Sequence, residues 1–257
     1  TAVQLASRPE NCIGCRACFS ACKYCAIDFD KTGRATVKRK ACIECMECTD
    51  VCYSEALTPL GKYVSAEELY REIVKDKVFY AKSKGGVTFS GGEPLMHVNQ
   101  EYLKLLTMLK EENISIGFDT CGYVLSENLK KVMEYTDFFL WDLKQMDADS
   151  HQKITGVDNA LILKNLQYAA KHKKIYIRYP LITGYTDDIG NQQQMADFLL
   201  KPIPELHIMP MHHMGTSRYQ YLGRNDAIEN IPLQENDDLE RVKNFFNERG
   251  IAAKIVG

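Results

Sequence analysis

Ten cysteines are the residues of this 257-residue chain whose spacing points most directly to chemistry. Nine of them lie in the first fifth of the chain, and eight of those form two runs of the pattern C-x2-C-x2-C-x3-C. Each cysteine of the first run recurs 30 residues later: Cys12, Cys15, Cys18 and Cys22 are repeated as Cys42, Cys45, Cys48 and Cys52. The segment is therefore an internal duplication.

The spacing within each run suits a cube-shaped 4Fe–4S cluster. Three closely spaced thiolates can reach three corners of one cube, and the fourth thiolate then points toward a second cube. We therefore predict a two-cluster ferredoxin module over residues 1–58. One cluster is assigned to Cys12, Cys15, Cys18 and Cys52, and the other to Cys42, Cys45, Cys48 and Cys22.

Other uses of these cysteines fit the pattern less well. Zinc sites pair two C-x2-C knuckles and have no use for a third cysteine in the same run. A disulfide scaffold is typical of short secreted chains, whereas here the long remainder holds a single cysteine, Cys121. The runs depart from the common pattern at one position. A proline usually follows the fourth cysteine, but here the residues are Lys23 and Tyr53. Cys25 is an additional thiol that is not assigned as a ligand.

Residues 59–257 are predicted to alternate strands with helices. Short buried strands are expected at residues 86–90, 114–119, 138–144, 174–179 and 206–210. Apolar residues recur at helical spacing between them, and Ser65 and Asn99 are suited to cap two of these helices. The alternation predicts an α/β fold with a mostly parallel sheet, open or closed into a full or partial barrel, with function at the carboxyl ends of the strands.

All five predicted strands end in residues that can bind or react. These residues are Gly91, Gly92 and Glu93, then Asp119, then Asp142 and Lys144, then Arg178, and finally His212 and His213. Each alone has an ordinary explanation as a turn, a helix cap, a surface ion pair or a solvated side chain, and Cys121 is more often a packing residue. Their coincidence at one edge of the sheet predicts a shared binding site.

The composition excludes some partners. Apolar residues make up 45% of the chain and charged residues 26%, and the net charge of −2 gives no reason to expect nucleic acid or an anionic membrane as a partner. No apolar run approaches the roughly 18 residues of a membrane span. No secretory signal is evident either, so a cytoplasmic protein is expected.

The strand-end motifs, in their order, resemble those of the glycyl-radical-enzyme activating enzymes, a branch of the radical S-adenosylmethionine (SAM) superfamily. The resemblance covers nearly the whole chain and rests on Val87–Pro94, Asp119–Gly122, Trp141–Lys144, Ile177–Pro180 and Met209–Gly215. It implies that residues 59–257 form a partial (β/α)6 TIM-like barrel. It also implies an enzyme of the oxidoreductase class, with a glycyl-radical enzyme as protein substrate, a donor such as flavodoxin or ferredoxin, and a monomeric state.

The resemblance also implies roles for individual residues. Gly91, Gly92 and Glu93 match the stretch that holds the SAM amino group, and Asp142, Leu143, Lys144 and His212 match residues around the rest of the cofactor, with Lys144 and His212 as the catalytic positions. Asp119 and Asp142 match carboxylates that hold a monovalent cation, and Arg178 flanks the cofactor. In this chemistry a reduced cluster cleaves SAM to a 5′-deoxyadenosyl radical, which takes a hydrogen atom from a glycine of the partner.

The family's C-x3-C-x2-C loop is the one motif that we do not find in its usual place. Only eleven residues precede Cys12, so we expect the chain to lack the first barrel strand and this loop, with a third cluster present only in a longer parent. Cys18, Cys22 and Cys25 have the required spacing, but using them would leave Cys12 and Cys15 without a role.

Two other functions are open at this point. A ferredoxin-type electron-transfer protein fused to an α/β docking domain would need only the eight cysteines. A radical SAM enzyme acting on a small molecule would use the strand ends differently.

Overall fold

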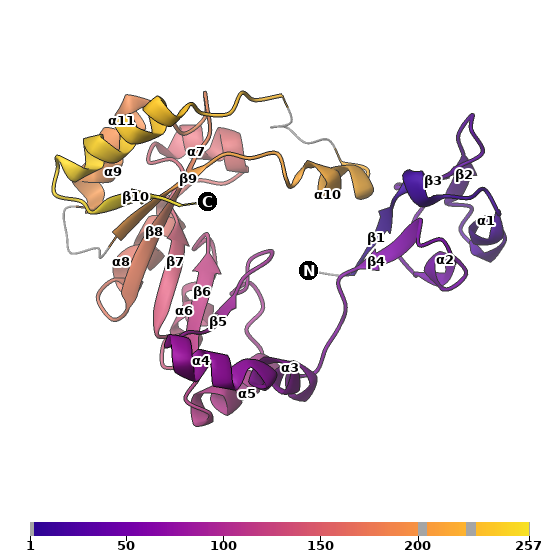
Figure 1. Cartoon of the computed structure of the whole chain (residues 1–257), viewed down its shortest axis with the longest axis horizontal. Coiled ribbons are helices and arrows are strands. Elements are labelled where there is room, and N and C mark those ends of the chain that lie inside the picture. Colours follow the sequence, from indigo (N-terminus) through magenta and orange to yellow (C-terminus); the bar gives the residue numbers. More distant parts are fainter. Residues whose placement is uncertain (1–2, 200–204, 225–229, 257) are drawn as a thin grey trace. The chain divides into compact units, whose positions relative to one another are not determined.

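The computed structural model describes residues 3–199, 205–224 and 230–256, which form two compact units (Figure 1). The first, which we call the cysteine unit, comprises Thr1–Tyr63 and His212–Asn230. The second, the sheet unit, comprises Val64–Met211 and Ile231–Gly257. The cysteine unit thus differs from the predicted module of residues 1–58, because a segment from late in the chain belongs to it.

The cysteine unit is built from two similar halves. Its elements are β1 (Gln4–Ser7), η1 (Pro9–Asn11), α1 (Ala17–Ala21), β2 (Ile27–Phe29), β3 (Ala35–Val37), α2 (Glu47–Asp50) and β4 (Leu57–Leu60). Strand β1 pairs antiparallel with β4, and β2 pairs antiparallel with β3. Each half is therefore a strand, a short helix and a strand, and the pairing of β1 with β4 ties the two halves together.

Few apolar side chains hold the cysteine unit together. Its buried cluster consists of Leu5, Cys18, Ile27, Ala35, Cys48 and Leu57. Two of these six are cysteines, and four of the partly buried residues around them are cysteines as well. A core of this size contributes little to folding on its own, because small domains bury too small a share of their apolar surface.

The late segment joins the cysteine unit through two arginines. It contains α10 (Thr216–Tyr221). Arg39 donates a hydrogen bond of 2.7 Å from Nη2 to the carbonyl oxygen of Tyr221, and the guanidinium of Arg8 lies 4.8 Å from the centroid of the Tyr221 ring. These contacts place α10 on the cysteine unit.

The sheet unit contains one six-stranded parallel sheet. Its strands are β5 (Gly86–Phe89), β6 (Ser115–Thr120), β7 (Phe138–Asp142), β8 (Lys174–Leu181), β9 (Glu205–Pro210) and β10 (Ala253–Ile255). They lie in the order β10-β9-β8-β7-β6-β5, so strands that follow one another in the chain are neighbours. The parallel α/β sheet and its five predicted strands are confirmed. The three-residue strand β10 was not predicted, since it is too short to show a periodic pattern.

Helices connect these strands. They are α3 (Ala66–Ile73), η2 (Val74–Asp76), α4 (Lys77–Ser83), α5 (Gln100–Glu111), α6 (Ser126–Val132), α7 (Ala148–Thr155), α8 (Ala160–Ala169), α9 (Ile189–Leu199) and α11 (Asn236–Asn247). Both predicted caps are present: Ser65 forms a capping box with Glu68 ahead of α3, and the Asn99 side chain accepts a hydrogen bond from the Tyr102 N–H at the start of α5. In the described residues no helix is long and apolar enough to span a membrane.

A large core fixes the sheet. Neighbouring strands contribute a row of buried aromatic side chains, in which the ring centroids of Phe118 and Phe139 lie 6.0 Å apart and those of Phe139 and Trp141 lie 5.9 Å apart. Each of these three side chains is fully buried. Because such a core resists deformation, the loops at the carboxyl ends of the strands start from fixed positions.

Candidate functional site

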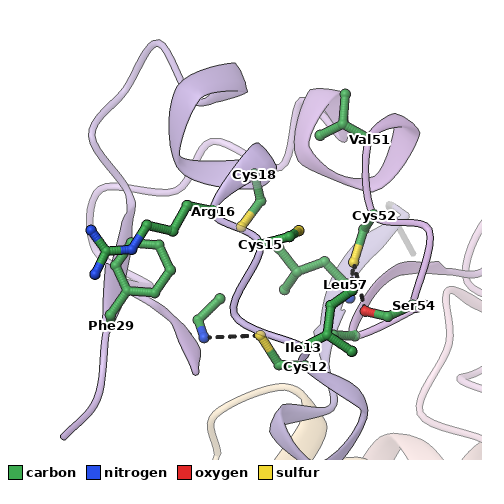
Figure 2. A pocket seen from close by; sticks show the side chains of 12 residues that line it. Cys12, Ile13, Cys15, Arg16, Cys18, Phe29, Val51, Cys52, Ser54 and Leu57 are labelled. Atoms are coloured by element: carbon green, nitrogen blue, oxygen red, sulfur yellow. Dashed lines mark hydrogen bonds between the residues drawn. The ribbon is translucent and has the colours of Figure 1, made fainter. Parts of the chain in front are cut away.

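Eight cysteines line two pockets of the cysteine unit. The first pocket contains Cys12, Cys15, Cys18 and Cys52, whose sulfur atoms point toward a common space (Figure 2). The second contains Cys22, Cys42, Cys45 and Cys48. The structure therefore brings together the same two groups of four that the spacing indicates. We refer to them as the first and second quartets.

The two quartets repeat the same pattern of burial. Cys18 and Cys48 are buried, Cys15 and Cys45 are exposed, and the other four cysteines are intermediate. Cys25 is exposed and lines neither pocket. Cys18, Cys22 and Cys25 are therefore not gathered around one space, because Cys18 belongs to the first pocket and Cys22 to the second.

The backbone around the cysteines is wound into the left-handed region at equivalent places in both halves. Three pairs of residues 30 positions apart have positive φ: Gly14 and Glu44 (71° and 59°), Arg16 and Met46 (65° and 66°), and Cys25 and Glu55 (51° and 54°). Five of these six residues are not glycine, and each such conformation costs about 1–2 kcal/mol. Residues with positive φ thus lie on both sides of Cys15 and of Cys45, a winding that is typical of concave backbone sites for anionic groups such as iron–sulfur clusters.

Burial and crowding act on the thiols inside the pockets. Burial raises the pKa of Cys18, and the facing thiols of Cys52 and Cys12 raise it further. Burial, followed by the effect of Cys42, raises the pKa of Cys48 to about 11. Ionising several thiols in so small a space requires a positive centre among them, and iron is one of the metals that soft thiolate ligands prefer.

Backbone donors already point at three of these sulfur atoms. The N–H groups of Ala35 and Leu57 donate to Sγ of Cys12 and Cys52, and that of Ala26 donates to Sγ of Cys22, each at 3.3 Å. No group of three or more His, Cys, Asp or Glu side chains in the described residues converges on a point suited to a single metal ion. The sulfur atoms of each quartet surround a volume instead, so the donor set fits a cluster of several irons.

Glu93 connects the ends of two strands in the sheet unit. It follows β5 after Gly91 and Gly92, which have φ values of 82° and 58°. Its Oε1 accepts a hydrogen bond of 2.7 Å from the hydroxyl of Thr120, and its Oε2 accepts one of 2.9 Å from the backbone N–H of Cys121. The carboxylate is thus held at the ends of β5 and β6 and retains lone pairs for a ligand.

Four charged side chains form a network across the next strand ends. The guanidinium of Arg178, on β8, pairs with Asp119 at the end of β6, and its Nε lies 3.7 Å from Oδ1 of Asp142 at the end of β7. Lys144 Nζ lies 2.9 Å from the other oxygen of Asp142. Two carboxylates and two cations thereby offset each other's formal charge. Their side chains are between 22% and 29% exposed.

Two features of this network leave room for a ligand. Burial raises the pKa of Asp119, while the Arg178 guanidinium acts in the opposite direction and Asp142 adds to the rise. Oδ1 of Asp142 is buried and has no hydrogen-bond partner in the described part of the chain. A buried acceptor without a partner is uncommon in proteins, and it suits a ligand donor or a cation.

Two of the predicted site residues are placed differently from the rest. The side chain of Leu143 is 1% exposed and belongs to the core, and its backbone N–H donates to the carbonyl of Arg178 at 2.9 Å, so it fixes β7 beside β8. His212 is exposed and lies in the segment that belongs to the cysteine unit. The predicted side chains that the sheet unit gathers are Glu93, Asp119, Asp142, Lys144 and Arg178.

Three residues that the sequence did not single out support this site. Thr120 holds Glu93, and Sδ of Met209 accepts a hydrogen bond of 3.1 Å from Nε of Arg178. Gln234 accepts a hydrogen bond from the N–H of Met211 at 3.0 Å and donates to the carbonyl of Leu181 at 2.8 Å, so it ties the chain after β9 to the end of β8. Thr120 lies inside one of the strand-end motifs. Gln234 lies in no motif and does not directly follow a predicted strand, so no sequence pattern indicated its role.

Comparison with protein families gives a match over most of the chain. The family model described as "Radical SAM superfamily" matches residues 13–191. The chain is 35% identical over 265 aligned positions to the trans-4-hydroxy-L-proline dehydratase activating enzyme of Clostridioides difficile, covering 99% of this chain and 85% of the relative. It is 31% identical to the indoleacetate decarboxylase activating enzyme of Tractidigestivibacter scatoligenes, covering 98% of this chain and 83% of that protein.

Solved structures agree with these sequence relatives. A domain of a pyruvate-formate lyase-activating enzyme from Bacteroides vulgatus is 29% identical, with a TM-score of 0.56, and the match covers 67% of this chain and 99% of that chain. A radical SAM methyltransferase from Sphaerobacter thermophilus, at 16% identity and a TM-score of 0.54, shares the fold.

Proposed function

This chain belongs to the radical SAM superfamily and is a glycyl-radical-enzyme activating enzyme that uses SAM, and we propose how its residues divide that work. The cysteine unit is a ferredoxin-like module whose two quartets each hold a 4Fe–4S cluster. The sheet unit binds SAM at the carboxyl ends of its strands. SAM, bound beside a reduced cluster with an open iron site, would supply one-electron cleavage of its sulfonium and hydrogen abstraction from a glycine of the partner enzyme. The two quartets, each with four cysteines, would pass electrons toward that cluster.

The carrying observation for the clusters is the composition of the two quartets. Each takes three thiols from one run and the fourth from the other run, as the duplicated pattern requires for two cubes. Backbone N–H groups donate hydrogen bonds to Sγ of Cys12, Cys22 and Cys52, and such bonds orient ligand side chains at metal sites. An external donor of the flavodoxin or ferredoxin type would approach the exposed Cys15 or Cys45 side of a quartet.

The SAM site is assigned to the five charged side chains of the sheet unit, together with Gly91 and Gly92. Glu93 is oriented by Thr120 and Cys121 to accept hydrogen bonds from the ammonium group of SAM. The left-handed backbone at the two glycines leaves that approach free of side chains. Lys144 and His212 are proposed as the catalytic contacts with the cofactor.

Asp119 and Asp142 are proposed to bind positive charge. Oδ1 of Asp142 lacks a hydrogen-bond partner in the described residues and is therefore the atom best suited to a monovalent cation. Arg178 neutralises part of the charge of the two carboxylates. The remaining negative charge suits a cation or a cationic part of the cofactor.

Iron analysis of the reconstituted full chain tests the cluster assignment. After anaerobic reconstitution we expect about eight irons and eight sulfides per chain, which is two cubes. Cys22→Ser removes a ligand of the second quartet and is expected to lower the iron content by about half. Cys25→Ser is the matched control, because Cys25 is three residues away and lines neither pocket. Equal iron losses in the two variants would refute the assignment, and about twelve irons would reveal a third cluster.

Calorimetric titration with SAM tests the sheet site independently of any activity. Glu93→Gln keeps the size of the side chain but removes its charge, and we expect SAM affinity to fall by roughly 10–100-fold, as for a lost charged hydrogen bond. Glu112→Gln is the control, since Glu112 pairs with Lys77 and Tyr70 away from these strand ends. Unchanged affinity in Glu93→Gln would place the ammonium group elsewhere.

A further inference from the structure

The duplication makes the two cluster pockets comparable residue by residue, and their charges differ. Apart from its cysteines, each pocket is lined by a single residue with a formal charge. In the first pocket this residue is Arg16, and in the second it is Glu47. The residues that line the two pockets therefore differ in formal charge. Two cations outside the lining, Arg39 and Lys23, also act on cysteines of the second quartet.

Arg16 is held beside the first quartet by an aromatic ring. Its guanidinium lies 5.0 Å from the centroid of Phe29, which also lines the pocket, and Figure 2 shows the two side chains together. No ion pair of Arg16 with a carboxylate exists among the described residues. Its charge is consequently not cancelled by a neighbouring acid. The equivalent residue of the second half, Met46, has the same backbone conformation and carries no charge.

Glu47 acts on the second quartet more weakly. Its Oε1 lies 3.0 Å from Nζ of Lys23, so a cation next to it offsets part of its charge. Both side chains of this pair are exposed, and so is Arg16, so solvent screens all three charges. The difference between the two pockets is that Glu47 has a partner of opposite charge and Arg16 has none among the described residues.

In the described part of the chain, the first quartet also receives more hydrogen bonds to its sulfur atoms than the second. The first quartet receives the N–H groups of Ala35 and Leu57, and the Ser54 hydroxyl lies 3.8 Å from Sγ of Cys52. In the second quartet the corresponding contact is the N–H of Ala26 to Cys22. Reduction adds one negative charge to a cluster, so donors to sulfur and nearby cations favour the reduced state.

We propose that Arg16, reinforced by these donors, sets the reduction potential of a cluster held by Cys12, Cys15, Cys18 and Cys52 above that of a cluster held by Cys22, Cys42, Cys45 and Cys48. This inference rests on the proposed function, namely that both quartets hold 4Fe–4S clusters. One electron from an external donor reduces one cluster by one unit of charge, with no bond made or broken. An electron that enters the module therefore settles on the first cluster. Cys18 and Cys48 belong to the same buried cluster of side chains, so the two quartets are neighbours.

The test is a potentiometric titration of the full chain with dithionite, monitored by electron paramagnetic resonance. Wild type is expected to show two one-electron steps. In Arg16→Gln the upper step should fall, with a roughly tenfold lower ratio of reduced to oxidised cluster at a fixed potential, which corresponds to about 59 mV. Arg16→Lys keeps the charge and should retain most of the wild-type value. If Arg16→Gln shifted the potential of the lower step instead, or left both potentials unchanged, the proposal would be overturned.

A reciprocal variant at the duplicated position tests the same idea on the other cluster. Met46→Arg adds a charge at the place equivalent to Arg16 and should raise the lower step, and Arg16→Met combined with Met46→Arg should reverse the order of the two clusters. Met46→Arg also decides the matter if Arg16→Gln loses iron, because it leaves the first quartet untouched. If it left the lower step unchanged, the proposal would be wrong. Iron and sulfide contents below two cubes in wild type would instead contradict the cluster assignment itself.

Discussion

The cysteine unit and the sheet unit build their sites in opposite ways. In the cysteine unit the functional side chains come from two short runs, and the backbone around them is strained at five non-glycine residues. Two of the six residues in its buried cluster, Cys18 and Cys48, are themselves proposed cluster ligands. In the sheet unit the functional side chains come from strand ends up to 85 residues apart, from Glu93 to Arg178. The core beneath them is large and contains none of the charged groups.

This difference indicates what each site needs in order to exist. The strained loops of the cysteine unit have little apolar burial to offset them, so the proposed clusters would supply the stabilisation. The sheet unit is stabilised by its core and holds Glu93, Asp119 and Arg178 in place without a ligand. Metal removal and core mutations should therefore affect different halves of the chain.

Iron removal is expected to have the largest effect. When a chelator strips the reconstituted protein under reducing conditions, the cysteine unit should lose its ordered structure, because metal binding and folding are coupled in such modules. We expect hydrogen exchange at the backbone amides of β1 to β4 to speed up by roughly 100-fold or more. Exchange at β6, β7 and β8 serves as the internal control and should remain slow. Equal protection of both units after chelation would show that the cysteine unit folds by its own core.

Gly122→Ala is expected to have the next largest effect, and on the sheet unit alone. Gly122 has φ of 73°, and an added Cβ would lie 2.2 Å from the ring of the buried Trp141. Strain and overpacking together should lower the free energy of unfolding of the sheet unit by about 2–4 kcal/mol. Urea titration followed by tryptophan fluorescence measures this loss, since Trp141 is the single tryptophan.

Gly156→Ala separates the two causes of that loss. Gly156 also has a positive φ, of 87°, but no atom lies within 4 Å of the added Cβ. Its replacement should cost only about 1 kcal/mol, from the backbone conformation. If the two alanine variants were equally stable, the contact with Trp141 would not be the reason why position 122 is glycine. In both variants the iron content should match that of wild type.

Much of both regions was predictable, and for different reasons. The quartets follow from spacing because cysteines three residues apart in a tight loop have few other arrangements. The strands follow from apolar periodicity, and polar residues at their ends could be assigned to one edge of a parallel sheet. The capping residues Ser65 and Asn99 could be recognised because a cap depends on residues only three positions away.

What the sequence did not indicate depends on contacts between distant residues. Arg178 joins Asp119 and Asp142 only because β8, β7 and β6 are neighbours with a particular register. Arg39 and Tyr221 are 182 residues apart, and no periodic pattern predicts that α10 belongs to the cysteine unit. Leu143 occurs in a motif between two charged residues, yet it faces the core because side chains alternate at the end of a strand.

Arg178→Met tests how the sheet unit tolerates its buried acids. The guanidinium lowers the pKa of Asp119, whereas burial and Asp142 raise it, so the variant should have a higher pKa at Asp119 than wild type. An acid whose folded pKa lies above its unfolded value stabilises the protein at low pH and loses that contribution as the pH rises through it. We expect the variant to lose about 1–2 kcal/mol more than wild type between about pH 4 and pH 7.

Urea midpoints measured across this pH range give the comparison. The loss of the contact between Arg178 and Met209 adds a constant that does not depend on pH, so the slope isolates the effect of charge. Arg178→Lys keeps a cation near Asp119 and should have a slope closer to that of wild type. Parallel curves for Arg178→Met and wild type would mean that Asp119 is not controlled by Arg178.

The smallest expected effect is that of Ser65→Ala, at the start of α3. The Ser65 hydroxyl accepts the Glu68 N–H at 3.1 Å, and the Glu68 carboxylate accepts the Ser65 N–H at 2.9 Å. Removing the hydroxyl leaves one helix N–H to water and should lower the free energy of unfolding of the sheet unit by about 1 kcal/mol. Ser65→Thr preserves the capping box and should be close to neutral. Because the hydroxyl and N–H of Ser65 form hydrogen bonds with Glu68 and not with Glu93 or Arg178, SAM affinity should be the same in both variants. The large core leads us to expect that the site of the sheet unit is independent of local stability. A change in SAM affinity would contradict that expectation.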